Sequence, residues 1–346
     1  MWQTARMIDR RTLIATGACT SAFTATSALA KHAPSTLQAL TPTRHPGRPN
    51  SYPSFLAGIK NQAGRLGVDE SVLNDALALD RPNSRVLELD RHQPEFTLTW
   101  AQYRSRVMTS QKIQGARNAY QQELKLLTGI WGRYAVDPRI AVGIWGLESN
   151  YGSRIGSFGV VDALATLAFD GRRAAFFRAE LLNALQILQH RDIASDRMLG
   201  SYAGAMGQPQ FMPSSYLRYA VDYDGDGRRD IWSSKADVFA SISNYLSRSG
   251  WTAGVPWGQE IMVPSGFDTS MAGREMRKPL DTWMHMGVRR RDGSRFSRGD
   301  VVGAVLLPDG AGGDAFMVYS NFAVIRRYNP SDFYSLAVGL LGSSAG

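Results

Sequence analysis

Cysteine is nearly absent from this sequence, because Cys19 is the only one among 346 residues. A single cysteine cannot form an internal disulfide, and it cannot supply the several thiolates of a structural zinc site. Histidine is also scarce, and the five histidines lack the spacing of zinc ligands: His32, His45, His92, His190 and His285. These absences exclude a disulfide-stapled scaffold and a Cys/His metal centre.

The sequence also lacks the glycine-rich loops that bind phosphates and the motifs that activate a nucleophilic serine. Basic residues outnumber acidic ones, with 39 Lys and Arg against 30 Asp and Glu and a net charge of +9. A basic surface suits a polyanion, which could be nucleic acid, acidic lipid or a carboxylate-rich wall polymer. The basic residues do not cluster with aromatic ones, however, so we predict no nucleic-acid partner.

Residues 12–30 carry no charge, follow the pair Arg10-Arg11, and end in the small-residue run Ala28-Leu29-Ala30. This pattern predicts that residues 1–30 are an export signal, which places the protein in the periplasm or cell envelope. The arginine pair favours the twin-arginine route. An aspartate precedes the pair where Ser or Thr is common in such signals, which leaves the general secretory route open.

Two other interpretations of this segment stay open. A membrane-spanning helix is disfavoured, because the segment is rich in Ser and Thr and only moderately apolar. A lipid anchor on Cys19 is disfavoured too, since Thr16 stands where a lipoprotein signal has Leu. Residues 31–53 are rich in proline and are predicted to be a flexible tether.

The rest of the chain, residues 54–346, is predicted to be α+β in class but mainly α. Apolar residues recur at helical spacing in several stretches: 55–77, 99–127, 137–152, 162–169, 173–189, 236–248 and 332–341. After Trp251 the pattern changes to short β-prone runs at 260–263, 301–307 and 315–319. These runs predict a small β lobe that follows the helices.

The most informative run is 145–152, which reads Trp-Gly-Leu-Glu-Ser-Asn-Tyr-Gly. Asp137-Pro138 can begin the helix, since Asp caps well and Pro fits the first position, and this places Glu148 near the helix end. Apolar neighbours should leave its carboxyl poorly solvated and raise its pKa, as a general acid requires. The alternative is a buried structural acid that pairs with Arg172 or Arg173.

A second informative segment runs from Gly200 to Tyr216 and is too rich in glycine and polar side chains to be ordinary core. Its glycines allow close backbone approach, and Ser201 and Gln210 carry groups that can bond to acetamide and hydroxyl groups. The alternative is a glycine-rich turn with capping serines, which the residues alone favour equally.

Together the two segments resemble the membrane-bound lytic murein transglycosylase B family, which are cell-wall enzymes with a lysozyme-like core. The resemblance covers roughly residues 50–340 and includes the run 321–329, Asn-Phe-Ala-Val-Ile-Arg-Arg-Tyr-Asn. It implies that residues 54–346 are a catalytic domain with a lysozyme-like core, an additional helical lobe and the small β lobe. It also implies no organic cofactor, peptidoglycan glycan strands as the partner, and cell-wall synthesis enzymes as further candidate partners.

The resemblance implies that Glu148 is the single catalytic acid/base. Family members cleave the β-1,4 bond between N-acetylmuramic acid and N-acetylglucosamine without water, because the muramyl C6 hydroxyl attacks C1 and leaves a 1,6-anhydro end. Ordinary glycosidases use two carboxylates, whereas an intramolecular nucleophile needs less activation. Two rival interpretations stay open: a hydrolytic muramidase and a catalytically silent peptidoglycan-binding protein.

By position in matching motifs, the resemblance also implies a set of substrate-binding residues. They are Tyr103, Arg173, Phe176, Ser201, Tyr202, Gln210, Tyr245, Tyr328 and Tyr334. Phe176 stands where a relative has tyrosine, so it can stack on a sugar but cannot donate a hydrogen bond. Gln208-Pro209 replaces the Tyr-Gly of some relatives. For each tyrosine taken alone, packing in the core or at its rim is the alternative.

Residues 222–230 place carboxylates at loop positions 1, 3, 5 and 9 and glycine at position 6, as an EF-hand does. Position 12 is Ser233 instead of Glu, so an EF-hand-like loop would have to span 222–237 and close with Asp237. The family carries such an atypical loop. The resemblance implies a structural Ca²⁺ with these ligands: Asp222, Asp224, Asp226, the carbonyl of Arg228, and Asp237. A metal-free acidic turn held by Arg228 or Arg229 is the alternative.

Overall fold

The computed structural model describes residues 51–91 and 98–346. The predicted export signal and most of the predicted tether lie outside these residues. Helix α1 begins at Tyr52, inside the stretch predicted as tether, because Ser51 accepts a hydrogen bond from the amide of Ser54 and Pro53 fits the first turn. The described chain is mainly helical with small antiparallel sheets, so the predicted class is confirmed.

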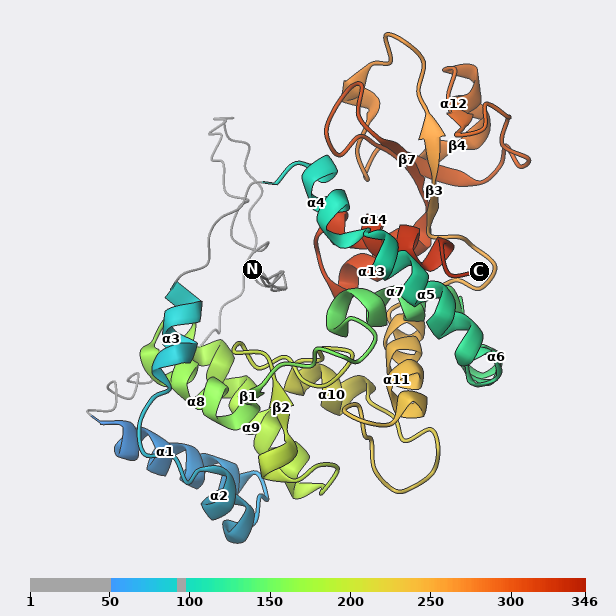
Figure 1. The fold of residues 1–346 in the computed structure, drawn as a ribbon. Helices are drawn as coiled ribbons and strands as arrows, with labels where there is room; N and C mark the ends of the chain where they lie inside the picture. Colours follow the sequence, from blue (N-terminus) through green and yellow to red (C-terminus); the bar gives the residue numbers. More distant parts are fainter. Residues whose placement is uncertain (1–50, 92–97) are drawn as a thin grey trace, which may run out of the picture.

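One end of the molecule is a helical lobe (Figure 1). Helices α8 and α9 pack on each other, and the three N-terminal helices pack against this pair. The bounds are α1 Tyr52–Arg65, α2 Glu70–Ala76, α3 Ser84–Arg91, α8 Val160–Asp170 and α9 Ala174–Gln189. Asn83 ties α3 to α8, because its side-chain amide donates to Asp162 at 2.6 Å and its backbone amide donates to Thr166 at 2.9 Å.

The middle of the molecule is a group of helices around α7 (Figure 1). The bounds are α4 Trp100–Val107, α5 Ser110–Gln122, α6 Leu124–Tyr134, α7 Pro138–Ser149, α10 Pro213–Tyr219, α11 Lys235–Arg248, α13 Ser320–Tyr328 and α14 Asp332–Ser343. The predicted start of α7 is confirmed, since Asp137 accepts a hydrogen bond from the amide of Arg139 at 3.0 Å. The helix ends where Asn150 and Tyr151 adopt left-handed φ angles of 50° and 59°.

Glycines bring α7 and α14 unusually close together. A Cβ atom at Gly143 would lie 2.5 Å from the carbonyl oxygen of Val338, and one at Gly342 would lie 2.7 Å from that of Arg139. Only glycine lets two backbones approach to this distance. The contact sets the first turn of α14 beside the last turn of α7, where Glu148 lies.

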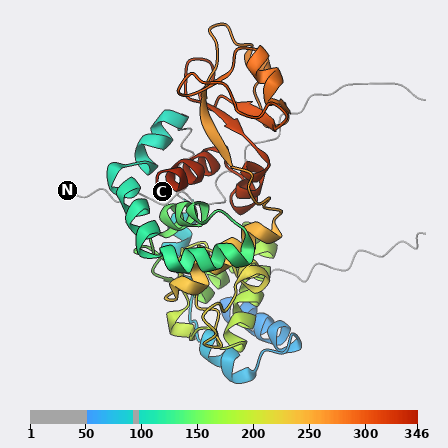
Figure 2. The ribbon, with the colours of Figure 1, turned by 90° about the vertical axis from the view of Figure 1, so that its right-hand side faces the viewer.

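The β lobe forms the opposite end of the molecule (Figures 1 and 2). Its five-stranded antiparallel sheet has the order β4-β6-β7-β3-β5. The bounds are β3 Gly258–Met262, β4 Lys278–Pro279, α12 Leu280–His285, β5 Arg289–Arg290, β6 Val302–Leu306 and β7 Ala315–Val318. A separate two-stranded ribbon joins β1 Phe158–Gly159 to β2 Leu199–Gly200. The predicted strands at 260–263, 301–307 and 315–319 correspond to β3, β6 and β7.

Two apolar cores hold these parts. A large core extends through the helical lobe and the central helices, and a smaller one fills the β lobe around the fully buried Trp283. Within residues 51–91 and 98–346, no helix has both the length and the apolar character needed to cross a membrane.

Candidate active site

Glu148 lies in the last turn of α7, and only 7% of the residue is exposed. The hydroxyl of Tyr334, from the first turn of α14, donates a hydrogen bond to Glu148 Oε1 at 2.7 Å. Tyr334 is fixed in turn, because its amide donates to the capping hydroxyl of Ser331 at 3.2 Å. The predicted burial of Glu148 is therefore confirmed, and a phenol fixed by α14 orients its carboxyl group.

Two more titratable side chains sense the charge of Glu148. Burial, and then the negative charge of Glu148, raises the pKa of Tyr103, so this phenol keeps its proton. Burial, and then the positive charge of Arg154, lowers the pKa of Lys112, whereas Glu148 opposes that shift. Lys112 also donates to the carbonyl oxygen of Gly146 at 2.9 Å. Sequence reasoning did not identify Lys112, because nothing in its local pattern distinguishes it from a surface lysine.

The arginines proposed as structural partners of Glu148 instead pair with Asp90 in the helical lobe. Arg172 lies 2.8 Å from the Asp90 carboxylate and Arg173 lies 3.8 Å from it, and Asp90 is only 2% exposed. Arg173 also lies over the ring of Phe177 at 5.1 Å, and Phe176 is 41% exposed beside it at the start of α9. Of the predicted substrate-binding residues, Arg173 and Phe176 thus belong to the helical lobe.

The glycine-rich segment 200–216 is held by close backbone contacts. Gly156, at a φ of 94°, approaches the carbonyl of Gly200 so closely that no Cβ atom would fit. The Ser201 hydroxyl accepts a hydrogen bond from the amide of Ala205 at 3.1 Å, which leaves its proton free to donate. Ser201 and Tyr202 are both partly exposed, so either can meet a ligand.

Gln210 is buried, with 2% exposure and a left-handed φ of 52°. Its side-chain amide donates to the carbonyl oxygens of Ile155 at 2.9 Å and Gly207 at 2.8 Å. Both donor hydrogens therefore serve the backbone, and the carbonyl oxygen of Gln210 is the atom that can meet a substrate.

Gln208, where the chain departs from the family pattern, links α7 to the acidic loop. It accepts a hydrogen bond from Trp145 Nε1 at 2.7 Å and donates to the carbonyl oxygen of Trp232 at 2.8 Å. Trp145 lies one turn before Glu148 on α7. Only that departure, Gln-Pro in place of Tyr-Gly, signals this position in the sequence.

Tyr245 and Tyr328 pack against the glycine-rich segment 200–216. The hydroxyl of Tyr328 donates to the carbonyl oxygen of Pro209 at 2.5 Å, and that of Tyr245 donates to the carbonyl oxygen of Arg327 at 2.5 Å. Their rings lie 4.8 Å apart, and each packs on Phe211 at 5.8 Å. In this structure both tyrosines make the packing contacts that the alternative interpretation expected.

Three acids of the predicted calcium loop come together. One carboxylate oxygen each of Asp222, Asp224 and Asp237 lie within 4.8 Å of one another. Asp237 is fully buried in the first turn of α11, where it accepts hydrogen bonds of 2.7 Å from the amides of Tyr223 and Asp230. Burial and, to a smaller extent, the neighbouring carboxylates raise the pKa of Asp237 to about 6 against the effect of these bonds.

The other predicted ligands lie differently. The carboxylate of Asp226 pairs with the guanidinium of Arg228 at 2.8 Å, outside the three-acid cluster. The side chain of Arg229 pairs with Asp192, outside the loop, at 2.5 Å. A cluster of oxygen donors with this charge suits a hard cation such as Ca²⁺, so the three acids fit the predicted metal.

A buried carboxyl at the end of a central helix, oriented by a phenol and flanked by a glycine-rich polar segment, defines a glycan-cleaving enzyme of the lysozyme-like class. The chain belongs to the transglycosylase SLT domain family, whose model matches residues 51–343. Its members are lytic transglycosylases, so the predicted family and enzyme class are confirmed.

Individual relatives agree with this assignment. The chain is 33% identical over 310 residues to membrane-bound lytic murein transglycosylase B of Escherichia coli, covering 83% of this chain and 81% of the relative. The crystal structure of SltB3 from Pseudomonas aeruginosa in complex with NAG-anhNAM-pentapeptide has a TM-score of 0.82 and 45% identity, covering 86% of this chain and 80% of that one. The Escherichia coli lytic transglycosylase Slt35 in complex with calcium has a TM-score of 0.71 and 30% identity, covering 84% and 92%.

Proposed function

We propose that this lytic transglycosylase cleaves the MurNAc-β-1,4-GlcNAc bond of peptidoglycan, with Glu148 as its single acid/base. The observation that carries this proposal is the buried carboxyl of Glu148 under the hydroxyl of Tyr334, in the fold of the transglycosylase SLT family. The complex of SltB3 with NAG-anhNAM-pentapeptide supports a peptidoglycan substrate and an anhydro product.

The reaction needs two proton transfers, and Glu148 takes part in both. Glu148 first donates its proton to the glycosidic oxygen, and the bond from that oxygen to the muramyl C1 breaks. The C6 hydroxyl of the same sugar then attacks C1, and the Glu148 carboxylate takes up the hydroxyl proton. The glycan leaves with a 1,6-anhydro ring and the enzyme regains its starting state. Because the nucleophile belongs to the substrate, no second carboxylate is required to activate water.

Product analysis separates this proposal from its rivals. Mass spectrometry of purified murein after digestion should find 1,6-anhydro-muramyl ends, which weigh one water less than hydrolysed ends. Reducing muramyl ends in their place would identify a hydrolytic muramidase. Measurable binding to murein with no new ends would identify a silent binding protein.

We expect Ser201 and Gln210 to respond differently to replacement by alanine. Ser201→Ala should lower the cleavage rate about tenfold with a small loss of stability, because it removes a partly exposed hydroxyl. Gln210→Ala should lower the free energy of unfolding by about 2 kcal/mol, because two buried carbonyl groups lose their hydrogen-bond donors. Cleavage assays and thermal melts of both variants check this. Full activity in Ser201→Ala would remove that residue from the substrate-binding set.

We propose that Asp222, Asp224 and Asp237 hold a structural Ca²⁺, which the calcium complex of Slt35 supports. Bound there, the ion would offset most of the negative charge of the three clustered acids and fix the loop to the start of α11. The cluster offers oxygen ligands only, so its chemistry suits folding stability and supplies no reacting group.

Calcium should raise the melting temperature, and more at pH 7 than at pH 5. Without metal, the pKa of Asp237 is raised from 3.8 to about 6. The metal-free protein therefore loses stability as the pH rises from about 4 to about 6. Below about pH 6, calcium must also displace the proton of Asp237 to bind, so its stabilising effect is smaller there. Asp224→Ala should remove the calcium response, whereas Asp300→Asn, an exposed ion-paired acid of the β lobe, should keep it. Asp226→Asn tests whether Asp226 is a ligand too, because the melting-temperature response to calcium should weaken only if its carboxylate binds the ion. A metal-free wild type whose melting temperature ignores calcium would contradict the proposal.

The same function requires export, so we propose that residues 1–30 direct the chain to the periplasm or cell envelope. Cell-wall synthesis enzymes remain proposed partners, because cleavage of glycan strands has to accompany insertion of new ones.

A further inference from the structure

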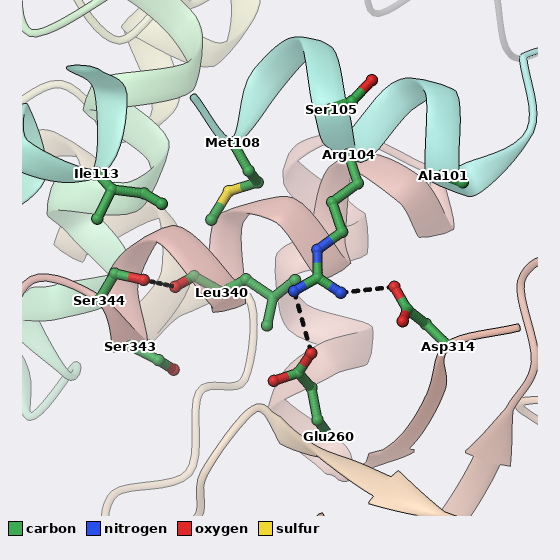
Figure 3. Close-up of a pocket in the computed structure, with 10 residues that line it drawn as sticks. All are labelled: Ala101, Arg104, Ser105, Met108, Ile113, Glu260, Asp314, Leu340, Ser343 and Ser344. Atoms are coloured by element: carbon green, nitrogen blue, oxygen red, sulfur yellow. Dashed lines mark hydrogen bonds and ion pairs between the residues drawn. The ribbon is translucent and has the colours of Figure 1, made fainter. Parts of the chain in front are cut away.

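Helix α4 is joined to the β lobe by ion pairs of one of its arginines, Arg104. The guanidinium of Arg104 lies 2.5 Å from Asp314, which precedes β7, and 3.2 Å from Glu260 on β3 (Figure 3). These groups line a cavity of about 530 Å³ between α4, the end of α14 and the β lobe. Arg104 meets one carboxylate on β3 and one just before β7, so it joins the β lobe to helix α4 at two points.

Further contacts fix the start of α4 to the same lobe. Asp309 accepts hydrogen bonds from the amides of Trp100 at 2.6 Å and Ala101 at 2.9 Å, as a helix cap contributed by a distant loop. Asp314 also accepts a hydrogen bond from Trp100 Nε1 at 2.7 Å. A helix of eight residues has little stability of its own, so these contacts, together with packing on α14, hold α4 in place.

An aromatic cluster connects the contacts between α4 and the β lobe to the active site. Phe316 of β7 packs edge-on against Trp100 at 5.6 Å, and Trp100 stacks on Tyr103 at 6.1 Å. Phe333 packs on both Trp100 and Tyr103, and it precedes Tyr334, whose hydroxyl holds Glu148. Tyr103 is close enough to Glu148 for the carboxylate charge to raise its pKa. The Tyr103 ring therefore packs on Trp100, which the β lobe contacts, and on Phe333, which precedes the tyrosine that holds Glu148.

We propose that the β lobe serves catalysis by positioning α4, with Arg104 as the positioning residue that keeps Tyr103 beside Glu148. The inference rests on the proposed function, because Tyr103 is taken to meet the bound glycan. The guanidinium of Arg104 pairs with Asp314 and Glu260 of the β lobe, so we infer that it acts on the site through the neighbouring Tyr103. A shift of about 1 Å at a reacting centre can lower a rate up to a hundredfold, so a loosened α4 should be measurable.

Arg104→Met is the decisive variant. It retains most of the side-chain volume, and the carboxylates keep other partners, since Trp100 still donates to Asp314 and Arg291 still pairs with Glu260 at 3.0 Å. Arg291→Met is the matched control, because it removes an arginine from the same Glu260 without touching α4. We expect kcat on purified murein to fall about tenfold in Arg104→Met and to stay within twofold of wild type in Arg291→Met.

Two readouts separate positioning from general stability. Hydrogen exchange of the α4 amides should quicken in Arg104→Met while exchange in α7 does not change. In a Tyr103→Phe background, Arg104→Met should lower kcat less than threefold, because the group that it positions is already gone. Arg104→Lys, which can keep one of the two ion pairs, should recover part of the rate, and it carries the same test if Arg104→Met fails to fold.

Equal rates in Arg104→Met and Arg291→Met would overturn the inference, as would a full tenfold loss in the Tyr103→Phe background. Both results require a wild type that cleaves murein to anhydro ends. A wild type that does not do so contradicts the proposed function instead, so the two failures can be told apart.

Discussion

Glu148→Gln should bind murein and keep its fold but lose cleavage, by about 100- to 10,000-fold. The amide has nearly the shape of the carboxyl group, and its oxygen can still accept the hydrogen bond from Tyr334. It cannot give a proton to the glycosidic oxygen or take one from the C6 hydroxyl. Both halves of the reaction therefore fail together, which gives this substitution the largest expected effect on rate.

Glu180→Gln is the matched control. Glu180 is also a buried glutamate, at 5% exposure, but it accepts hydrogen bonds from the amide and hydroxyl of Ser214 at the start of α10. In Glu180→Gln, the side-chain NH₂ group would face either the amide or the hydroxyl of Ser214, which both donate. Stability should therefore fall while murein cleavage continues. The measurements are anhydro-end formation and thermal melting for both variants. A folded Glu148→Gln that still forms anhydro ends at a substantial rate would show that another group carries the proton.

The sequence predicted well where local chemistry decides the structure. The start of α7 follows from the cap Asp137 and the proline after it, and the burial of Glu148 follows from its apolar neighbours. The glycine and acid spacing of the loop at 222–237 likewise predicted that Asp237 would lie beside Asp222 and Asp224. Each of these features depends on a few residues that are close in the chain.

The predicted helix at 99–127 was wrong in its continuity. It is three helices, because Thr99 and Thr109 each cap a new one and the chain turns again at Glu123. Gly115 lies inside α5, where the ring of Tyr151 occupies the space that a Cβ atom would need. Apolar spacing carries over from one short helix to the next, so periodicity alone could not place the breaks.

Long-range hydrogen bonds could not be predicted at all. Motif position marked Tyr328 as substrate-binding, yet its hydroxyl donates to Pro209, which is 119 positions away. The same holds for Tyr334 and Glu148, which are 186 positions apart. Nothing in the local sequence says whether a tyrosine hydroxyl meets a ligand, a carboxylate or the backbone, because that depends on how distant helices pack.

The packing of α7 on α14 leads to the second large effect, which we expect from Gly143→Ala. A Cβ atom at position 143 would meet the carbonyl oxygen of Val338 at 2.5 Å, and a helix backbone cannot move aside as a flexible side chain can. The helices must separate, so we expect the free energy of unfolding to fall by about 1–3 kcal/mol even though alanine favours helix more than glycine does. Since α14 carries Tyr334, the shift should also displace its hydroxyl from Glu148 and lower the cleavage rate.

Gly132→Ala tests whether this cost comes from the helix contact or from the substitution itself. Gly132 lies within α6, and nothing lies within 4 Å of a Cβ atom built there. Alanine should therefore stabilise the protein at that position by up to about 1 kcal/mol, without a change in rate. Denaturant unfolding should show a lower stability than wild type for Gly143→Ala and a higher stability for Gly132→Ala. Murein cleavage should fall only in Gly143→Ala. If Gly143→Ala instead matches Gly132→Ala in both measurements, the backbones of α7 and α14 can separate freely, and their close approach does not position Tyr334.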